Sequence, residues 1–339
     1  MEKFTLDKLP NKVLEKIDLE TAFMASRLII AAERFQVFRE LHRKKLPAHE
    51  IGKRLKIHKK FLTNFLDALV SMGLLSKEGD VYRNSALAEK YFIKERTIYW
   101  TRQFSRECVA AFEAYTVLEK VLSTGEISHA VKRANKKNYL EAMKDDAEEA
   151  KDFTQMLFYY HQPNAEALAE YLNLEEKQAI LDVGGGSGVM SIVLVKKNPN
   201  VRACIMDIEP VCKIAEENIS NSGLSHRMSV ISGDFRKGLP EGFDVIICCD
   251  IGRVPKELVR EAYRRLPSKG IIVLVDRFLA KDRTEPLDRL LYQFEGSGFG
   301  TETKEDMIHL LKDCGFKNTH MHKLINDVWV ITGTKLDRL

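Results

Sequence analysis

The sequence of 339 residues lacks the cysteine pairs that metal sites and redox motifs use. Its six cysteines include no Cys-x-x-Cys pair and have no histidine nearby at zinc-ligand spacing. We therefore expect free, reduced thiols and no metal site.

A long apolar run is also missing. Residues 1–20 (MEKFTLDKLPNKVLEKIDLE) mix charged with apolar side chains, which fits neither a secretory signal nor a membrane span of about 20 apolar residues. The sequence thus predicts a cytoplasmic protein with no membrane association. A composition of 45% hydrophobic and 30% charged residues is typical of a globular chain and not of a disordered one.

Charge is nearly balanced overall but not along the chain. The net charge is +4, yet the first hundred residues hold 20 lysines and arginines against 13 acidic residues, an excess of about seven positive charges. The length predicts about two domains of roughly 150 residues each. The basic excess therefore belongs to an N-terminal domain.

That N-terminal part has the pattern of a helical domain with a small β wing. Residues 20–43 place apolar side chains around nearly the whole helix circumference, which predicts a helix buried on more than one side and packed on a partner. Residues 47–75 predict two helices with a turn near Ile57 and His58, which is helix-turn-helix spacing. Residues 76–85 (SKEGDVYRNS) predict two short strands. The inward residues of the second helix and its end are expected to be Phe61, Leu62, Phe65, Leu69 and Leu74.

The C-terminal part alternates strands and helices. AILDVG, RACIMDI, MSVISGD, FDVIICC and GIIVLVD are short apolar runs separated by stretches of helical character, the pattern of a parallel sheet covered on both faces. Near the end, NTHMHKLI and DVWVITGTK are joined by about two residues, so they require an antiparallel hairpin. We expect an α/β fold with a mostly parallel sheet and one reversed strand.

LDVGGGSGVMSIVLVKK joins a strand to a helix through a glycine-rich turn. Gly184, Gly186 and Gly188 let the backbone turn sharply and approach a ligand where a Cβ would collide. Dinucleotide sites favour G-x-G-x-x-G, whereas Val189 stands here where the last glycine would fall. The loop indicates a nucleotide-type ligand and disfavours hydride chemistry, with a purely structural turn as the alternative.

Acidic residues end the next two strands. Asp207 is placed to accept hydrogen bonds from two ribose hydroxyls. Asp234 can accept from an adenine amino group while the Phe235 ring lies on the base. Each acid alone could be a helix cap, but features at three successive strand ends favour one adenosyl-binding site.

The succession LDVGGGSG, MDIEP, SGDF and P-x-G-F-D-V resembles the plant- and bacterial-type small-molecule O-methyltransferases. AHEIGKRL and SALAEKYF upstream extend the resemblance over nearly the whole chain. It implies a Rossmann-like domain that binds S-adenosylmethionine, and an N-terminal winged-helix-like domain through which the chain forms a homodimer.

Transferred residue by residue, the resemblance also implies roles for single side chains. Gly184 would contact the methionine part of the cofactor, Asp207 the ribose, and Asp234 with Phe235 the adenine. Cys249 falls where the family often has a lysine that contacts the cofactor. Its neighbour Cys248 points to the opposite face of the strand.

The histidine that the family uses as general base is missing. Arg253 falls on its place when the loop is counted forward from Asp244, but an arginine stays protonated and cannot be a base. Arg253 could clamp an anionic substrate or lie solvated at a helix terminus. Asp276 matches one flanking glutamate as a shorter acid, and Thr301 falls on the other, with Glu302 beside it.

Three alternatives explain the missing histidine: an acceptor that arrives ionised, such as a thiolate or acid; a carbon nucleophile; or a base from elsewhere. His161, Tyr159, Tyr160 and Asp276 are the candidate bases, and each also has an ordinary structural interpretation. We take His161, Asp276 and Arg253 as the candidate catalytic residues.

The basic residues of the N-terminal part raise a rival hypothesis, a DNA-binding regulator with a ligand-sensing domain. Lys53, Arg54 and Lys56 precede the second helix, and Lys59 and Lys60 open it. Dimerisation explains the same helices, so nucleic acid is not the expected partner. Methylation of a protein side chain stays open as a third hypothesis.

The sequence therefore predicts a methyltransferase in three parts. Residues 1–105 form the dimerisation domain, residues 106–165 a helical connector that lines the substrate pocket, and residues 166–339 the S-adenosylmethionine-binding domain. The acceptor is expected to be a small molecule, methylated on oxygen, sulfur, carbon or a carboxylate.

Overall fold

A computed structural model describes residues 9–15, 17–93, 109, 111–125, 143–176, 178–294 and 300–336. The chain divides into two compact units, Met1–Val109 and Ala110–Leu339. None of the described helices combines the length and the apolar composition that crossing a bilayer requires.

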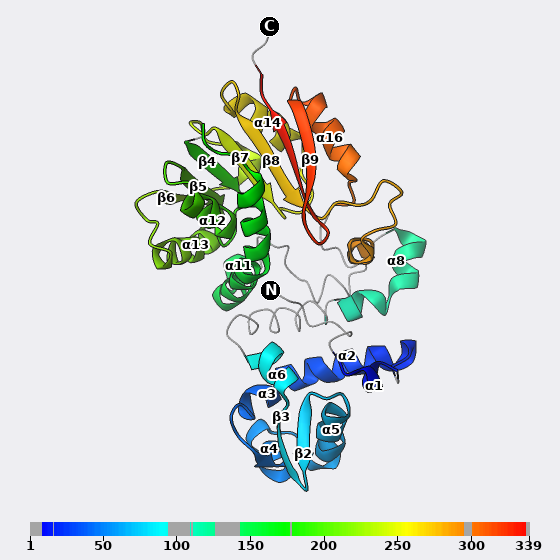
Figure 1. Ribbon diagram of the computed structural model, residues 1–339. Coiled ribbons are helices and arrows are strands. Elements are labelled where there is room, and N and C mark those ends of the chain that lie inside the picture. The colour runs from blue at the N-terminus through cyan, green and yellow to red at the C-terminus, as the bar shows by residue number, and fades with distance from the viewer. Residues whose placement is uncertain are drawn as a thin grey trace. The chain divides into compact units, whose positions relative to one another are not determined.

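The first unit is a helical domain with a three-stranded sheet (Figure 1). A capping box between Asp18 and Thr21 starts α2: the side chain of each residue accepts a hydrogen bond from the backbone N–H of the other. The two helices of the expected helix-turn-helix are α4 and α5, and Lys56 turns between them in the left-handed region. The elements are α1 (Asn11–Leu14), α2 (Leu19–Arg34), α3 (Val37–Glu40), β1 (Leu46–Pro47), α4 (Ala48–Leu55), α5 (Lys59–Ser71), β2 (Leu75–Glu78), β3 (Val81–Asn84), α6 (Ala86–Ala88) and η2 (Glu89–Ile93).

Two expectations for this unit were wrong, and the wing was confirmed. The helix expected over 20–43 breaks because Gln36 adopts a left-handed conformation with φ of 58°. Phe61 is 62% exposed, since Leu62, Leu66 and Leu69 take the inward face of α5. The predicted wing is the antiparallel pair β2 and β3, which turns at Gly79.

The second unit is built on a seven-stranded sheet in the order β6-β5-β4-β7-β8-β10-β9 (Figure 1). All five predicted strands of the parallel part are present, and β10 is the one reversed strand, antiparallel to both β8 and β9. The expected hairpin is β9 and β10. The strands are β4 (Ala179–Val183), β5 (Arg202–Asp207), β6 (Met228–Ser232), β7 (Val245–Cys249), β8 (Ile271–Asp276), β9 (Lys317–Ile325) and β10 (Val328–Thr334).

Helices cover both faces of this sheet, as the apolar runs on its strands require. One core lies under α11, α12 and α13, and a second lies under α14 and α16 (Figure 1). The single helix α11 runs through residue 165, where the connector was expected to end. The helices are α8 (Leu118–Thr124), α11 (Ala147–Tyr171), α12 (Val189–Lys197), α13 (Glu209–Asn221), η3 (Phe235–Lys237), α14 (Lys256–Arg265), α15 (Leu287–Leu291), η4 (Tyr292–Phe294) and α16 (Lys304–Asp313). Residues 106–108, 110 and 126–142 of the connector lie outside the described residues.

The turn from β4 into α12 brings the backbone close to β5. Gly188 caps α12 with φ of 78°, and a Cβ placed on it would lie 2.4 Å from Cδ1 of Ile205. Glycine is therefore required at 188 both for its conformation and for its lack of a side chain.

We expect Gly188→Ala to lower the free energy of unfolding by about 2–4 kcal/mol, from left-handed strain plus overpacking. Ile205→Val removes the clashing methyl group and alone costs about 1 kcal/mol. In the double variant the loss should be smaller than the sum of the single losses by about 1 kcal/mol. Urea unfolding of the four proteins measures this, and strictly additive losses would contradict the packing argument.

Candidate active site

The candidate site lies at the carboxyl ends of the parallel strands. From β4 the chain proceeds outward through β5 to β6 and then returns to the other side of β4 as β7. This reversal opens a crevice between the ends of β4 and β7, where α/β folds bind their ligands. Gly184 follows β4 and Asp250 follows β7, so both residues border it.

In the glycine loop, backbone N–H groups that donate a hydrogen bond alternate with N–H groups that donate none to the described residues. The N–H groups of Gly185 and Ser187 make no hydrogen bond to any residue that the structure describes, so they are the donors the loop can offer to a ligand. A Cβ on Gly186 would meet nothing closer than the Gly184 oxygen at 4.0 Å, which leaves room beside the loop. The other three N–H groups donate hydrogen bonds: Gly184 to the Met206 oxygen (2.8 Å), Gly186 to Oδ2 of Asp207 (2.9 Å) and Gly188 to the Gly185 oxygen (2.9 Å).

Asp207 joins the end of β5 to this loop. Its Oδ2 accepts from Gly186, and its Oδ1 accepts from the N–H of Ile208 at 2.7 Å. The side chain is buried, and burial raises the pKa of Asp207 against the effect of these two backbone donors. A carboxylate held rigidly in this way can accept further hydrogen bonds from hydroxyl groups at fixed positions.

Asp234 and Phe235 follow β6. The Arg236 guanidinium grips both oxygens of Asp234, at 2.8 and 2.7 Å, and this hydrogen bonding lowers the pKa of Asp234 to about 2. Phe235 is half-buried, and its ring lies 3.9 Å from where a Cβ of Gly184 would be. The ring therefore borders the loop on the side of β6.

Asp182, which sequence reasoning missed, lies buried on β4 next to the glycine loop. Its Oδ2 accepts from the Ser191 hydroxyl at 2.7 Å, and burial raises the pKa of Asp182 to about 6. A Cβ on Gly185 would lie 2.7 Å from the Asp182 carboxyl carbon, which explains the middle glycine. The motif letters LDVGGG contain this acid, so its position next to the loop was the available signal.

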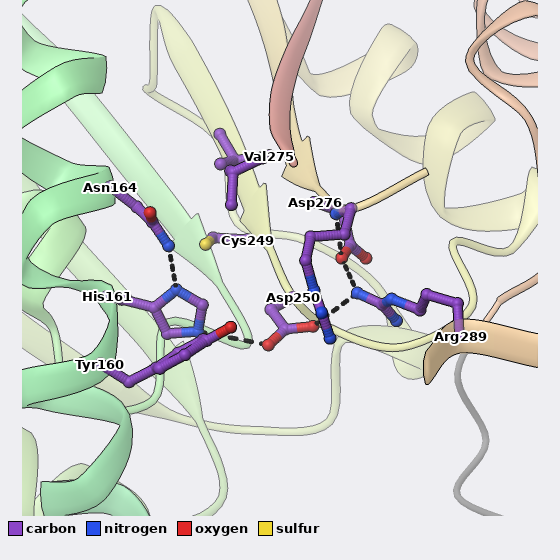
Figure 2. A pocket seen from close by; sticks show the side chains of 10 residues that line it. Tyr160, His161, Asn164, Cys249, Asp250, Val275, Asp276 and Arg289 are labelled. Atoms are coloured by element: carbon purple, nitrogen blue, oxygen red, sulfur yellow. Dashed lines mark hydrogen bonds and ion pairs between the residues drawn. The ribbon is translucent and has the colours of Figure 1, made fainter. Parts of the chain in front are cut away.

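A second cluster of polar side chains lies beside the ends of β7 and β8 (Figure 2). Nε2 of His161 on α11 is hydrogen-bonded to Oδ2 of Asp250 at 3.2 Å, and its Nδ1 is hydrogen-bonded to the Asn164 amide nitrogen at 3.0 Å. Arg289 on α15 contacts Oδ1 of Asp250 at 3.4 Å and also Oδ1 of Asp276. These side chains line one pocket together with Tyr160, Cys249, Val275, Arg277 and Val328.

Two buried carboxyls in this pocket share one guanidinium, and their pKa values move apart. Burial alone would raise the pKa of Asp250, but the hydrogen bond from His161 and the charges around it hold it below its ordinary value. Burial, and then the charge of Asp250, raise the pKa of Asp276 to about 8 against the attraction of Arg289. The ionised form is thus favoured on Asp250, and the protonated form is favoured on Asp276.

The structure brings two of the three predicted catalytic residues together. His161 and Asp276 lie in one pocket, bridged by Asp250 and Arg289. Arg253 lies outside it, with its side chain 78% exposed and its Nε bonded to Glu302 at 2.9 Å.

Cys248 and Cys249 do point to opposite faces of β7, one into each core. Cys249 lines the pocket, and burial raises the pKa of its thiol well above the ordinary value. Within the described part of the chain no group of three His, Cys, Asp or Glu side chains could hold a metal ion.

Sequence reasoning missed Asp250 and Arg289. Asp250 is an acid directly after β7, and the rule that pointed to the strand-end acids Asp207 and Asp234 would have found it. Arg289 carried no local signal, because only the folded loop after β8 brings it to the two carboxylates.

Comparison with known proteins places this geometry in a family. Residues 115–317 match the O-methyltransferase domain, and residues 17–94 match the O-methyltransferase dimerisation domain. The chain is 27% identical over 313 residues to the tetracenomycin polyketide synthesis 8-O-methyl transferase TcmO of Streptomyces glaucescens, covering 88% of this chain and 90% of that one. It is 23% identical to the N,N-dimethyltransferase OxyT of Streptomyces rimosus, covering 94% and 95%.

Among solved structures, the fold matches that of PigF with SAH at a TM-score of 0.83 and 19% identity, over 95% of this chain and 99% of that one. The matched domain alone spans more than half of the sequence. The chain therefore belongs to the O-methyltransferase family, and it is an S-adenosylmethionine-dependent methyltransferase with the family's dimerisation domain at its N-terminus.

Proposed function

We propose that the enzyme methylates a small-molecule hydroxyl whose proton is taken by Asp276. The observation that carries this proposal is the pair of carboxyls at the ends of β7 and β8: the ionised form is favoured on Asp250, and the pKa of Asp276 is raised. The polar pocket lies at the same edge of the sheet as the glycine loop, which is the arrangement that transfer between two bound molecules requires.

The glycine loop and its neighbours would hold the cofactor. The free amides of Gly185 and Ser187 suit its carboxylate, Asp207 suits the ribose hydroxyls, and the ring of Phe235 offers a face for the adenine. S-adenosylmethionine supplies an electrophilic methyl group on a sulfonium. Asp234 is already gripped by Arg236, so contact with the adenine amino group would add to that ion pair.

Asp276 is better placed to accept a proton than its neighbours. The Arg277 backbone N–H and the Arg289 guanidinium both donate to its Oδ1. Oδ2 accepts no hydrogen bond from the described residues and belongs to a pocket-lining side chain. His161 has both ring nitrogens engaged, so we assign it the role of holding Asp250 in place. Arg253, exposed and paired with Glu302, fits a solvated surface residue.

The cofactor site can be tested by calorimetry with S-adenosylmethionine and S-adenosylhomocysteine. We expect Asp207→Ala to weaken binding of both by about a hundredfold, because it removes the ribose acceptor and frees the Gly186 amide. Glu209→Ala, two residues later on the exposed side of α13, should bind like the parent. Parent protein that binds neither nucleoside would end the proposal.

The role of Asp276 predicts a rising pH profile. A base must be deprotonated, and the raised pKa of about 8 means that kcat/KM should rise tenfold per pH unit up to about pH 8 and then level off. Asp276→Asn should lower kcat by about 10²–10⁴-fold and abolish this rise. The assay needs an acceptor found by screening phenols, thiols and acids.

Asp313→Asn is the matched control, since Asp313 lies on the surface of α16 and pairs with Lys256. It should leave the profile unchanged. An Asp276→Asn enzyme with parental kcat, or a parent whose rate is flat from pH 6 to pH 9, would exclude Asp276 as the base.

We also infer that the protein is a homodimer joined through its N-terminal unit. The match to the dimerisation domain supports this, as do large apolar side chains that the unit leaves exposed, among them Met24 (53%) and Phe61 (62%). Exposed apolar side chains of this size suit a surface that a second copy covers.

Light scattering should give about twice 38.8 kDa for the parent. Met24→Asp combined with Phe61→Asp should shift the mass toward one chain, because charges resist burial in an apolar interface. Met321→Asp, at an exposed apolar residue of the other unit, should leave the mass unchanged. A monomeric parent would contradict the inference.

A further inference from the structure

The glycine loop is held from outside at one peptide by a side chain. In the peptide between Ser187 and Gly188, the N–H donates to the Gly185 oxygen and the C=O accepts from Nδ2 of Asn218 at 2.9 Å. Both polar groups of this peptide are therefore fixed, and the peptide cannot rotate without losing a buried bond. The peptide before it carries the free N–H of Ser187.

Asn218 is itself oriented by a third residue. It lies on α13 with 7% of its surface exposed, and its Oδ1 accepts from Nε2 of Gln155 at 2.9 Å. An asparagine amide has an oxygen at one end and a nitrogen at the other. The donor on Gln155 claims the oxygen, so the nitrogen must face the Ser187 carbonyl.

Gln155 belongs to α11, the helix that supplies Tyr160, His161 and Asn164 to the acceptor pocket. Six residues of helix, roughly 9 Å of rise, separate Gln155 from His161. The chain Gln155–Asn218–Ser187 thus connects the helix of the acceptor pocket with the loop of the cofactor site. Its atoms are buried or half-buried, which strengthens such bonds relative to water.

We propose that Asn218 is a positioning residue for cofactor binding: oriented by Gln155, it fixes the peptide 187–188 and thereby the direction of the Ser187 amide. Asn218 need not touch the cofactor. This inference rests on the proposed use of the glycine loop as the cofactor site, and it adds a residue and a helix to that site.

The first test is Asn218→Asp. The carboxylate keeps the size of the side chain and the bond from Gln155, but it loses the donor to the Ser187 carbonyl. We expect the dissociation constant of S-adenosylhomocysteine to rise about tenfold. Asn221→Asp, which adds the same charge to the exposed end of the same helix, should leave it within about twofold.

The second test acts from α11. Gln155→Glu presents only acceptors, so the Asn218 amide should invert and turn its oxygen toward the Ser187 carbonyl. Gln155→Met removes the donor without forcing that inversion. We therefore expect cofactor affinity to fall in the order parent, Gln155→Met, Gln155→Glu. The hydrogen bond described for Gln155 goes to Asn218 and not to the loop.

Calorimetric titration with S-adenosylhomocysteine and the thermal midpoint are measured for every variant. A merely structural role would lower the midpoint and leave the affinity of the folded fraction unchanged, and that result would overturn the proposal. Equal affinities for the Met and Glu variants at 155 would also overturn it. Failure of the parent to bind would instead refute the cofactor site, so the two failures are distinguishable.

Discussion

The guanidinium of Arg289 contacts two carboxyl groups that are mostly shielded from solvent. Its side chain is 2% exposed and contacts both Asp250 and Asp276. A buried charge is costly unless it is paired, and the only other guanidinium among the pocket-lining residues, that of Arg277, is itself paired with Asp288. The pocket resolves this by giving Asp250 a second partner in His161 and by leaving Asp276 as the carboxyl that retains its proton more easily.

The two halves of the site are held in place by different kinds of contact. In the proposed cofactor half, backbone hydrogen bonds, left-handed glycines and a side chain from α13 fix the loop. On the acceptor side four titratable side chains from α11, β7, β8 and α15 hold one another. Both depend on parallel strands ending at one edge, because that is what brings residues 184, 207, 250 and 276 together.

Local patterns in the sequence were enough to predict most of the fold and about half of the site residues. The period of apolar residues predicted the strands and the hairpin, an acid at a strand end pointed to Asp207 and Asp234, and the family resemblance pointed to Asp276. The break at Gln36 and the exposure of Phe61 left no trace in that period, since they depend on a single left-handed residue and on which neighbours compete for one face. Arg289 and Asn218 were beyond reach for a related reason: their partners lie far away in the sequence.

The missing histidine restricts the acceptor more than the pocket lining does. In the proposed role, a carboxyl whose pKa burial raises takes a proton from a phenol more readily than from an alkyl hydroxyl, because the phenol has the lower pKa. An alkyl hydroxyl, with a pKa near the value of about 15.7 for water, opposes the transfer far more. With Asp276 as the proposed base, the site suits an acidic hydroxyl, whose negative charge is delocalised once the proton has left.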